Sequence, residues 1–382
     1  MHAFVLFVTM VFLAGCGGKV LDLGNDALAT TPRYATPETV RAEADAPRGT
    51  PTVIATGQSD VCALAVDATR VYWSTTGYYY EASPEEAFVR SCEKDNCAAT
   101  VVTYASAQAT SCRIAVDSAR VYWPVEEHSP EGLRAIVACP IAGCSHGPEI
   151  VAQSGEVVDI AVDETSLYWI GASNQLFKCS LSDCRNSQIP LAPLEHNPSG
   201  VFEPGRLGVG STHIYWVEGD ASGSIMMIPK DGSLPARALV TDLHFPKSLA
   251  MTETTIFWRE YFSVGEIRSC ALPDCAGGPS LVASRQAYSN LLGVEKGSAY
   301  WFKVVGQSWT SAPGVPTELF ECSEKGCGSS PDLLLTDWKN PSAIAVDRTH
   351  VYWTSYGEPR EPRSCCSDAF HDGTVQRLLR RK

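Results

Sequence analysis

The sequence predicts an all-β fold, a seven-bladed β-propeller of four-stranded antiparallel blades, from three observations. A triplet of an aliphatic residue, an aromatic residue and Trp recurs with successive tryptophans 42 to 52 residues apart. A short apolar segment precedes every triplet, and the seventh unit is divided between the two ends of the chain. A supersecondary unit repeated at this period is typical of propellers. The triplets end at Trp73, Trp123, Trp169, Trp216, Trp258, Trp301 and Trp353.

The segment before each triplet has the pattern of a strand that is buried on both faces. Nine residues before each Trp the chain has Leu or Ile, and eight before it Ala or Gly without exception, as in Leu64-Ala65 and Leu207-Gly208. A short apolar run between turn residues is typical of such strands. Innermost strands converge on the propeller axis, so we expect the small residue to let neighbouring blades approach.

A turn follows this strand, and in four copies it opens with a carboxylate. An Asp that opens a tight turn accepts hydrogen bonds from backbone N–H groups two residues on, which predicts a structural role. A metal-binding ring is the alternative, and it is disfavoured because the other copies have Gly210, Thr252 and Glu295 at this position. The four carboxylates are Asp67, Asp117, Asp163 and Asp347.

After each Trp a variable loop, a third strand, a turn and a fourth strand complete a four-stranded meander, the blade of a propeller. Beyond Trp353 only one further strand is evident, around Thr374 to Leu378. Pro51 to Thr56 has the pattern of a fourth strand and precedes the first inner strand. We therefore expect this N-terminal strand to complete the last blade and close the ring, which leaves no open edge.

Five blades carry Cys-x4-Cys at the turn between their third and fourth strands. Residues opposed across a hairpin meet the Cα separation of a disulfide, and blade 4 has the turn sequence Pro229 to Gly232 instead. Zinc is the alternative, but a tetrahedral site needs two pairs to converge, and hairpins of different blades lie apart. The expected disulfides are Cys92–Cys97, Cys139–Cys144, Cys179–Cys184, Cys270–Cys275 and Cys322–Cys327.

Four other cysteines occur as two further candidate pairs. Cys62 and Cys112 occupy matching positions before the inner strands of blades 1 and 2, which allows a bridge between adjacent blades. Cys365 and Cys366 are neighbours, and form either a vicinal disulfide or two reactive thiols. With Cys16 assigned to a lipid, an even number of cysteines remains for pairing.

The N-terminus has the features of an export signal. Ala3 to Leu13 is an apolar run too short to span a bilayer. The following Leu13-Ala14-Gly15-Cys16 resembles the bacterial lipobox. That resemblance implies a signal peptide over residues 1–15, lipidation of Cys16, and an outer-membrane lipoprotein of the bacterial envelope that faces the periplasm or the cell surface. The alternatives are an ordinary cleaved signal and a buried helix.

Two further ranges complete the predicted organisation. Residues 16–50 are rich in Ala, Thr, Pro, Asp and Glu with little periodicity, which predicts a flexible tether, since such a segment cannot bury enough apolar surface to offset its ordering entropy. Residues 51–382 form the propeller. A formal net charge of −13 argues against nucleic acid or an anionic lipid surface as partner.

The repeats carry a family resemblance. The segments LAVDATRVYW, IAVDSARVYW and IAVDRTHVYW resemble β-propellers of the YWTD and NHL type over roughly Pro51 to Lys382. The resemblance implies the fold, and such propellers host binding, scaffolding and lyase activities. Streptogramin lyases are similar seven-bladed propellers with a metal-dependent reaction, but their catalytic positions have no match in this sequence.

The sequence has no Ser nucleophile elbow, HExxH or phosphate-binding Gly loop. We expect no catalytic residues, cofactor or metal. His213 and His350 share a repeat position, where they read as turn residues.

We expect the functional surface on the face that carries the loops between second and third strands. These loops include Ser74–Ala87, Pro124–Leu133, Lys303–Thr317 and Thr354–Gly373. Aromatic residues on loops over a rigid scaffold are typical of a recognition surface; the alternative is that they only cover the loops and the channel mouth. The candidate binding residues are Tyr78, Tyr79, Tyr80, Trp309, Trp338 and Tyr356.

The predicted function is therefore a monomeric, membrane-anchored binding or scaffold module for a protein or glycan, with the lipid as its only membrane contact. A metal-dependent lyase or hydrolase of the streptogramin-lyase type is the alternative.

Overall fold

The computed structural model describes residues 49–75, 87–106, 112–125, 134–171, 173–194, 207–219, 221–261, 265–305, 315–359 and 370–380. All of them belong to one compact unit, Asp45–Lys382. The predicted signal peptide and nearly all of the predicted tether lie outside these ranges.

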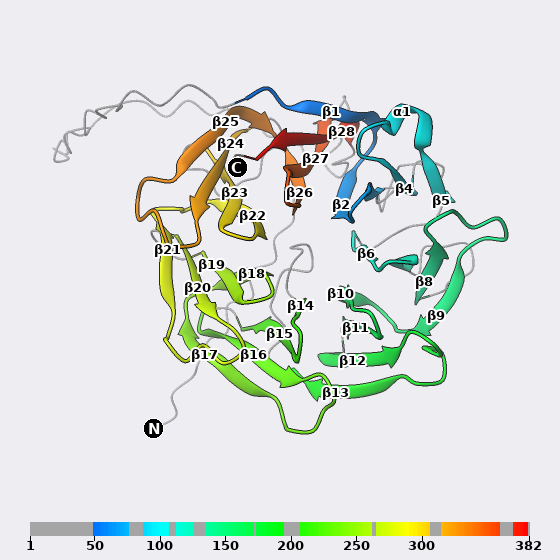
Figure 1. Ribbon diagram of the computed structural model, residues 1–382, viewed down its shortest axis with the longest axis horizontal. Helices are drawn as coiled ribbons and strands as arrows, with labels where there is room; N and C mark the ends of the chain where they lie inside the picture. The colour runs from blue at the N-terminus through cyan, green and yellow to red at the C-terminus, as the bar shows by residue number, and fades with distance from the viewer. Residues whose placement is uncertain are drawn as a thin grey trace, which may run out of the picture. The chain divides into compact units, whose positions relative to one another are not determined.

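The described residues form seven four-stranded antiparallel sheets arranged as the blades of a ring, which confirms the predicted seven-bladed β-propeller (Figure 1). We number the blades by the order of their tryptophans. The first strands lie nearest the axis, and in blades 1 to 7 they are β2 (Val61–Val66), β6 (Ala115–Val116), β10 (Val157–Val162), β14 (Leu207–Val209), β18 (Pro246–Met251), β22 (Ser289–Glu295) and β26 (Pro341–Val346).

The second and third strands form the middle of each blade. The second strands, which contain the triplets, are β3 (Arg70–Thr75), β7 (Arg120–Val125), β11 (Ser166–Gly171), β15 (His213–Glu218), β19 (Thr255–Glu260), β23 (Ser298–Val304) and β27 (His350–Pro359). The third strands are β4 (Phe88–Glu93), β8 (Ala135–Pro140), β12 (Gln175–Ser180), β16 (Gly223–Pro229), β20 (Glu266–Ala271), β24 (Pro316–Ser323) and β28 (Phe370–Leu379).

The outer strands complete the blades. They are β5 (Val102–Ser106), β9 (Glu149–Gln153), β13 (Ile189–Pro193), β17 (Arg237–Leu243), β21 (Ser280–Ser284), β25 (Asp332–Lys339) and β1 (Thr52–Gln58). One short helix, α1 (Cys97–Thr100), lies in the hairpin of blade 1.

The last blade combines strands from both ends of the chain, in the order β1-β28-β27-β26. Strand β1 runs antiparallel to β28, with Thr52 opposite Arg377. Strands β27 and β28 have ten residues each and pair as far as Pro359 and Phe370. The predicted loop Thr354–Gly373 is therefore longer than the observed connection. Its two ends pair with each other as parts of β27 and β28, so only residues 360–369 lie between the strands.

The triplet supplies the core between neighbouring blades. Successive residues of a strand point to opposite faces, so the triplet's middle residue and its Trp pack against different neighbours. Tyr72 of blade 1 lies in one apolar cluster with Trp123 of blade 2, and Tyr122 of blade 2 in the next cluster with Trp169 of blade 3. The relation continues around the ring to Tyr352 of blade 7 and Trp73 of blade 1.

The small residue of the inner strand is required by the approach of the next blade. A Cβ added to Gly208 would lie 2.6 Å from Sδ of Met251 in blade 5, and one added to Gly293 would lie 2.8 Å from Cγ2 of Val346 in blade 7. Both distances are shorter than a van der Waals contact, so the structure confirms the predicted steric reason for Ala or Gly at this position.

The aspartates are turn residues, as predicted, and they also hold the triplet tyrosines. Asp67 Oδ1 accepts hydrogen bonds from the backbone N–H groups of Thr69 and Arg70 at 2.7 and 2.6 Å. Its Oδ2 accepts one from the Tyr72 hydroxyl at 2.6 Å. The same pair recurs as Asp117 with Tyr122, Asp163 with Tyr168 and Asp347 with Tyr352.

Candidate functional site

The propeller presents two different faces. The connections between first and second strands lie on one of them, which we call the turn face, and each has two or three residues, such as 67–69 and 296–297. The connections between second and third strands lie on the opposite face, which we call the loop face. Their lengths differ strongly from blade to blade.

The long connections between second and third strands are grouped on adjacent blades. Blades 3, 4 and 5 have only 172–174, 219–222 and 261–265 between their second and third strands. The other four blades, which follow one another around the ring as 6, 7, 1 and 2, have much longer ones. We call this sector the long-loop arc, and its connections are 305–315, 360–369, 76–87 and 126–134.

Four of the six predicted binding aromatics lie outside the described residues, namely Tyr78, Tyr79, Tyr80 and Trp309. The structure places the other two in strands rather than loops, Trp338 in blade 6 and Tyr356 in blade 7, which corrects the expectation from the sequence. Trp338 belongs to β25, is partly buried, and packs edge-on against Trp353 with ring centroids 5.5 Å apart.

Tyr356 lies in β27, and its side chain is half-buried. Burial raises the pKa of its hydroxyl; the negative charge of Asp60 raises that pKa further, and the positive charge of Arg113 opposes both. Tyr356 is therefore not one of the exposed loop aromatics that the sequence suggested, and it stays neutral at physiological pH.

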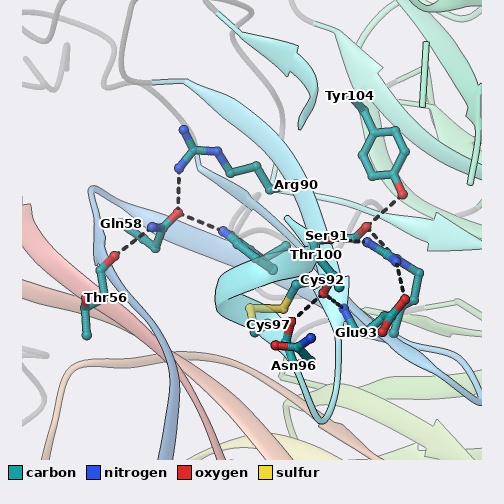
Figure 2. Close-up of a disulfide and its surroundings, with 12 residues drawn as sticks. Thr56, Gln58, Arg90, Ser91, Cys92, Glu93, Asn96, Cys97, Thr100 and Tyr104 are labelled. Atoms are coloured by element: carbon teal, nitrogen blue, oxygen red, sulfur yellow. Dashed lines mark hydrogen bonds and ion pairs between the residues drawn. A yellow bond between two sulfur atoms is a disulfide. The ribbon is translucent and has the colours of Figure 1, made fainter. Parts of the chain in front are cut away.

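The sequence pattern did not reveal two buried glutamines that bind the indole N–H groups of triplet tryptophans. Gln58 Oε1 accepts hydrogen bonds from Trp73 Nε1 and Arg90 Nη1, each at 3.0 Å, and Figure 2 shows Arg90 pointing toward Gln58. Gln286 accepts one from Trp301 Nε1 at 3.0 Å in the same way. Both glutamines stand 15 residues before their Trp, a spacing that a search of the columns further upstream would have found.

Two lysines on the turn face cross from one blade to its neighbour. Lys230 Nζ of blade 4 lies 2.7 Å from Asp163 Oδ2 of blade 3. Burial by itself raises the pKa of Asp163, but the hydrogen bonds from Lys230 and from the turn N–H groups outweigh it and lower the pKa to about 2. Lys94 makes the equivalent contact with Asp347, whose pKa is also lowered.

The structure joins twelve cysteines in six disulfides. Five close the hairpins between third and fourth strands, with Cα–Cα distances from 4.7 to 5.7 Å, and Figure 2 shows one of them, Cys92–Cys97. The sixth joins Cys62 to Cys112 at a Cα–Cα distance of 5.1 Å and so links blade 1 to blade 2. Cys16, Cys365 and Cys366 lie outside the described residues.

The described ranges contain no group of three or more His, Cys, Asp or Glu side chains that could hold a metal ion. The histidines that share a repeat position were expected in turns, but His213 and His350 are the first residues of β15 and β27, directly after the turn. His213 Nδ1 lies 2.8 Å from Thr212 Oγ1, and His350 Nδ1 lies 2.8 Å from Thr349 Oγ1. Among the helices of the described part of the chain, none is long and apolar enough to cross a membrane.

The blade topology and the two unlike faces define this protein as a seven-bladed β-propeller with a sector of long loops. No protein-family model matches the sequence, and no curated protein matches it.

The likeness to solved structures is at the level of the fold. The β-propeller domain of Cps50 (Swd1) from Myceliophteria thermophila is 7% identical, with a TM-score of 0.55, and the match covers 86% of this chain and 99% of that one. BamB from Moraxella catarrhalis is 8% identical, with a TM-score of 0.51, over 86% and 97% of the two chains. Neither likeness identifies the YWTD or NHL type.

Proposed function

We propose that this protein is a binding or scaffold module that engages a protein or glycan through the long-loop arc. The observation that carries the proposal is the grouping of the long second-to-third-strand connections on blades 6, 7, 1 and 2, opposite a turn face whose first-to-second-strand turns have only two or three residues. A rigid framework that varies in one sector is the usual arrangement of recognition loops on a scaffold.

The framework supports this role because the loop ends are held firmly. Each long connection leaves and enters strands of a blade whose triplet is buried; Trp73 and Trp301, for example, are both almost completely inaccessible. The disulfide Cys62–Cys112 further ties blade 1 to blade 2 inside the arc. Fixed loop ends reduce the conformational entropy lost on binding.

The proposed location of the protein rests on its N-terminal sequence alone. We propose that Cys16 carries a lipid and that the propeller faces the periplasm or the cell surface on a flexible tether. Replacing Cys16 by Ala should move the protein from the membrane fraction to the soluble fraction and abolish incorporation of labelled fatty acid. Unchanged fractionation of C16A would argue against the anchor.

The binding role is tested by exchanging a long loop for a short one from the same protein. Residues 76–87 are replaced by 172–174, a connection that already joins the equivalent strands β11 and β12. A second variant carries Ala at Tyr78, Tyr79, Tyr80 and Trp309. Purified protein is presented to envelope extracts and to peptidoglycan fragments, with cross-linking, in the presence and absence of EDTA.

We expect both variants to lose a ligand that the native protein captures, while their unfolding curves stay unchanged. The control is Leu234→Ala, which alters an exposed apolar side chain on the turn face and should capture normally. Capture that survives both changes contradicts the proposal. Turnover of a captured ligand that stops with EDTA would instead indicate the metal-dependent enzyme.

A further inference from the structure

A small cavity lies on the propeller axis, in the half of the channel nearer the loop face. Its volume is about 220 Å³, and it is lined by the inner strands of six blades and the residues before them. Its two charged residues come from adjacent blades, and the other lining residues are apolar. The lining residues that the argument uses are Ala63, Arg113, Asp159, Leu291, Leu292 and Ala343.

The polar part of the wall is a buried pair of opposite charges. Arg113 and Asp159 are only 3% and 6% exposed, and Arg113 Nε lies 3.6 Å from Asp159 Oδ1. Arg113 and Asp159 come from adjacent blades, at the same repeat position ten residues before Trp123 and Trp169. The pair offers both hydrogen-bond donors and acceptors to the cavity.

Backbone groups hold this pair in place. Arg113 donates to the carbonyl oxygens of Val158 at 2.7 Å and Cys112 at 2.9 Å. Asp159 accepts hydrogen bonds from the N–H groups of Ile160 at 2.9 Å and Leu207 at 3.0 Å. The carbonyl of Cys112 is itself positioned by the disulfide to Cys62, so the charged wall is preorganised.

The lining residues contributed by blades 6, 7 and 1 are all apolar. Leu291 has φ +50° at a β-bulge of β22, a conformation that bulky L-residues rarely adopt. Strained residues of this kind persist where the surroundings fix them, and they concentrate at functional sites. Ala63 and Ala343 line the cavity at the equivalent position of blades 1 and 7, where their small side chains occupy little of its volume.

We propose that this axial cavity binds a small, uncharged molecule with an apolar body and one polar end that both donates and accepts hydrogen bonds, as a primary carboxamide does. An amide carbonyl accepts from Arg113 while its NH₂ group donates to Asp159, and the body contacts Leu291, Leu292 and Ala343. A charged end group is disfavoured because the opposite charges of the wall attract and repel it at once. The volume limits the ligand to a size below that of typical drug-sized ligands.

Ligand-observed NMR on the purified protein tests the proposal with three probes of equal size: benzamide, benzoate and benzylamine. We expect saturation transfer to benzamide, with binding of the two charged probes weaker by about tenfold or more. Binding of no probe, or equal binding of all three, would overturn the proposal.

Two substitutions locate the site. Ala343→Leu fills the cavity from blade 7 and should abolish benzamide binding, whereas Ala98→Leu, on an exposed position of α1, should leave it unchanged. Should the larger side chain unfold the protein, Ala63→Val narrows the cavity from the other side. Asp159→Asn should shift the preference from benzamide to benzoate, since Arg113 then faces a neutral partner. Benzamide binding that persists in A343L or A63V refutes the axial site.

Discussion

Lys94 of blade 1 places its Nζ 2.6 Å from Oδ2 of Asp347 in blade 7, although the two residues stand 253 positions apart in the chain. The same ammonium group donates to the backbone oxygen of Asp67 in its own blade and lies 5.3 Å from the ring centroid of Tyr352. One side chain thus joins the first Asp turn to the last one, at the junction where the chain's two ends meet.

We predict that Lys94→Met lowers the free energy of unfolding by about 1.5–3 kcal/mol, the usual cost of removing a hydrogen bond to a charged group. The side chains of Lys94 and Asp347 are only 9% and 19% exposed, so water compensates little. Denaturant unfolding followed by tryptophan fluorescence measures the change. Lys325→Met is the control, because Lys325 is exposed; equal curves for both variants would show that the contact contributes nothing.

A second prediction concerns pH. The folded-state pKa of Asp163 is about 2, below the ordinary aspartate value of 3.8. A carboxyl group with a lowered folded pKa binds its proton more tightly in the unfolded chain, so its contribution to stability is complete above about pH 4 and is lost as the pH falls toward about 2. We expect the free energy of unfolding to decrease over that window. In Asp163→Asn this decrease should be smaller.

The control for this experiment is Glu164→Gln, which removes the neighbouring exposed carboxylate without touching Lys230. Its pH dependence should follow that of the native protein. If D163N and the native protein lose stability in parallel between about pH 4 and about pH 2, Asp163 is not linked to folding in this way.

The disulfides give a third prediction, which is a rank order. In the chain-entropy model, a disulfide stabilises more when it closes a longer loop. Cys62–Cys112 closes 50 residues, and Cys179–Cys184 closes 5. Replacing both cysteines of the first pair by Ser should therefore cost about 4 kcal/mol, and of the second about 2 kcal/mol. Thermal unfolding under non-reducing conditions compares them, and the reverse order would contradict the model.

The repeat columns were sufficient to predict the architecture, because each column has one local steric or hydrogen-bonding reason. The Ala or Gly of the inner strand, the Asp of the turn and the buried Trp all act the same way wherever they recur. The contact of Lys94 with Asp347 could not be predicted, since no local pattern relates residues so far apart in sequence.

The candidate site was harder to predict for a related reason. Trp338 stands 15 residues before Trp353, just as Gln58 and Gln286 stand 15 residues before Trp73 and Trp301. The sequence suggested that Trp338 is a loop residue, but its side chain packs in the core against Trp353. The loop expected over Thr354–Gly373 contains Gly357 and Pro359, yet β27 continues through both because β28 pairs with it along its whole length. Whether a residue at one of these positions lies in a loop or packs in a strand depends on the partner strand, and the neighbouring sequence does not identify that partner.

The last prediction is that β1 closes the ring. Strand β1 pairs with β28 as the outer strand of blade 7, and Tyr352 of blade 7 shares an apolar cluster with Trp73 of blade 1. Removing residues 49–59 leaves the edge of β28 without its partner. Exposed strand edges favour association with other chains, so the truncated protein should unfold at a lower temperature and aggregate, whereas a chain that begins at Gly49 should behave like the full one.

Hydrogen exchange supplies the local measurement: amides of β28, from Gly373 to Arg377, should lose protection far more than those of β16, which has the same place in blade 4. Equal protection of β28 in both chains would show that the ring is held by the blade contacts alone and that β1 adds nothing to closure.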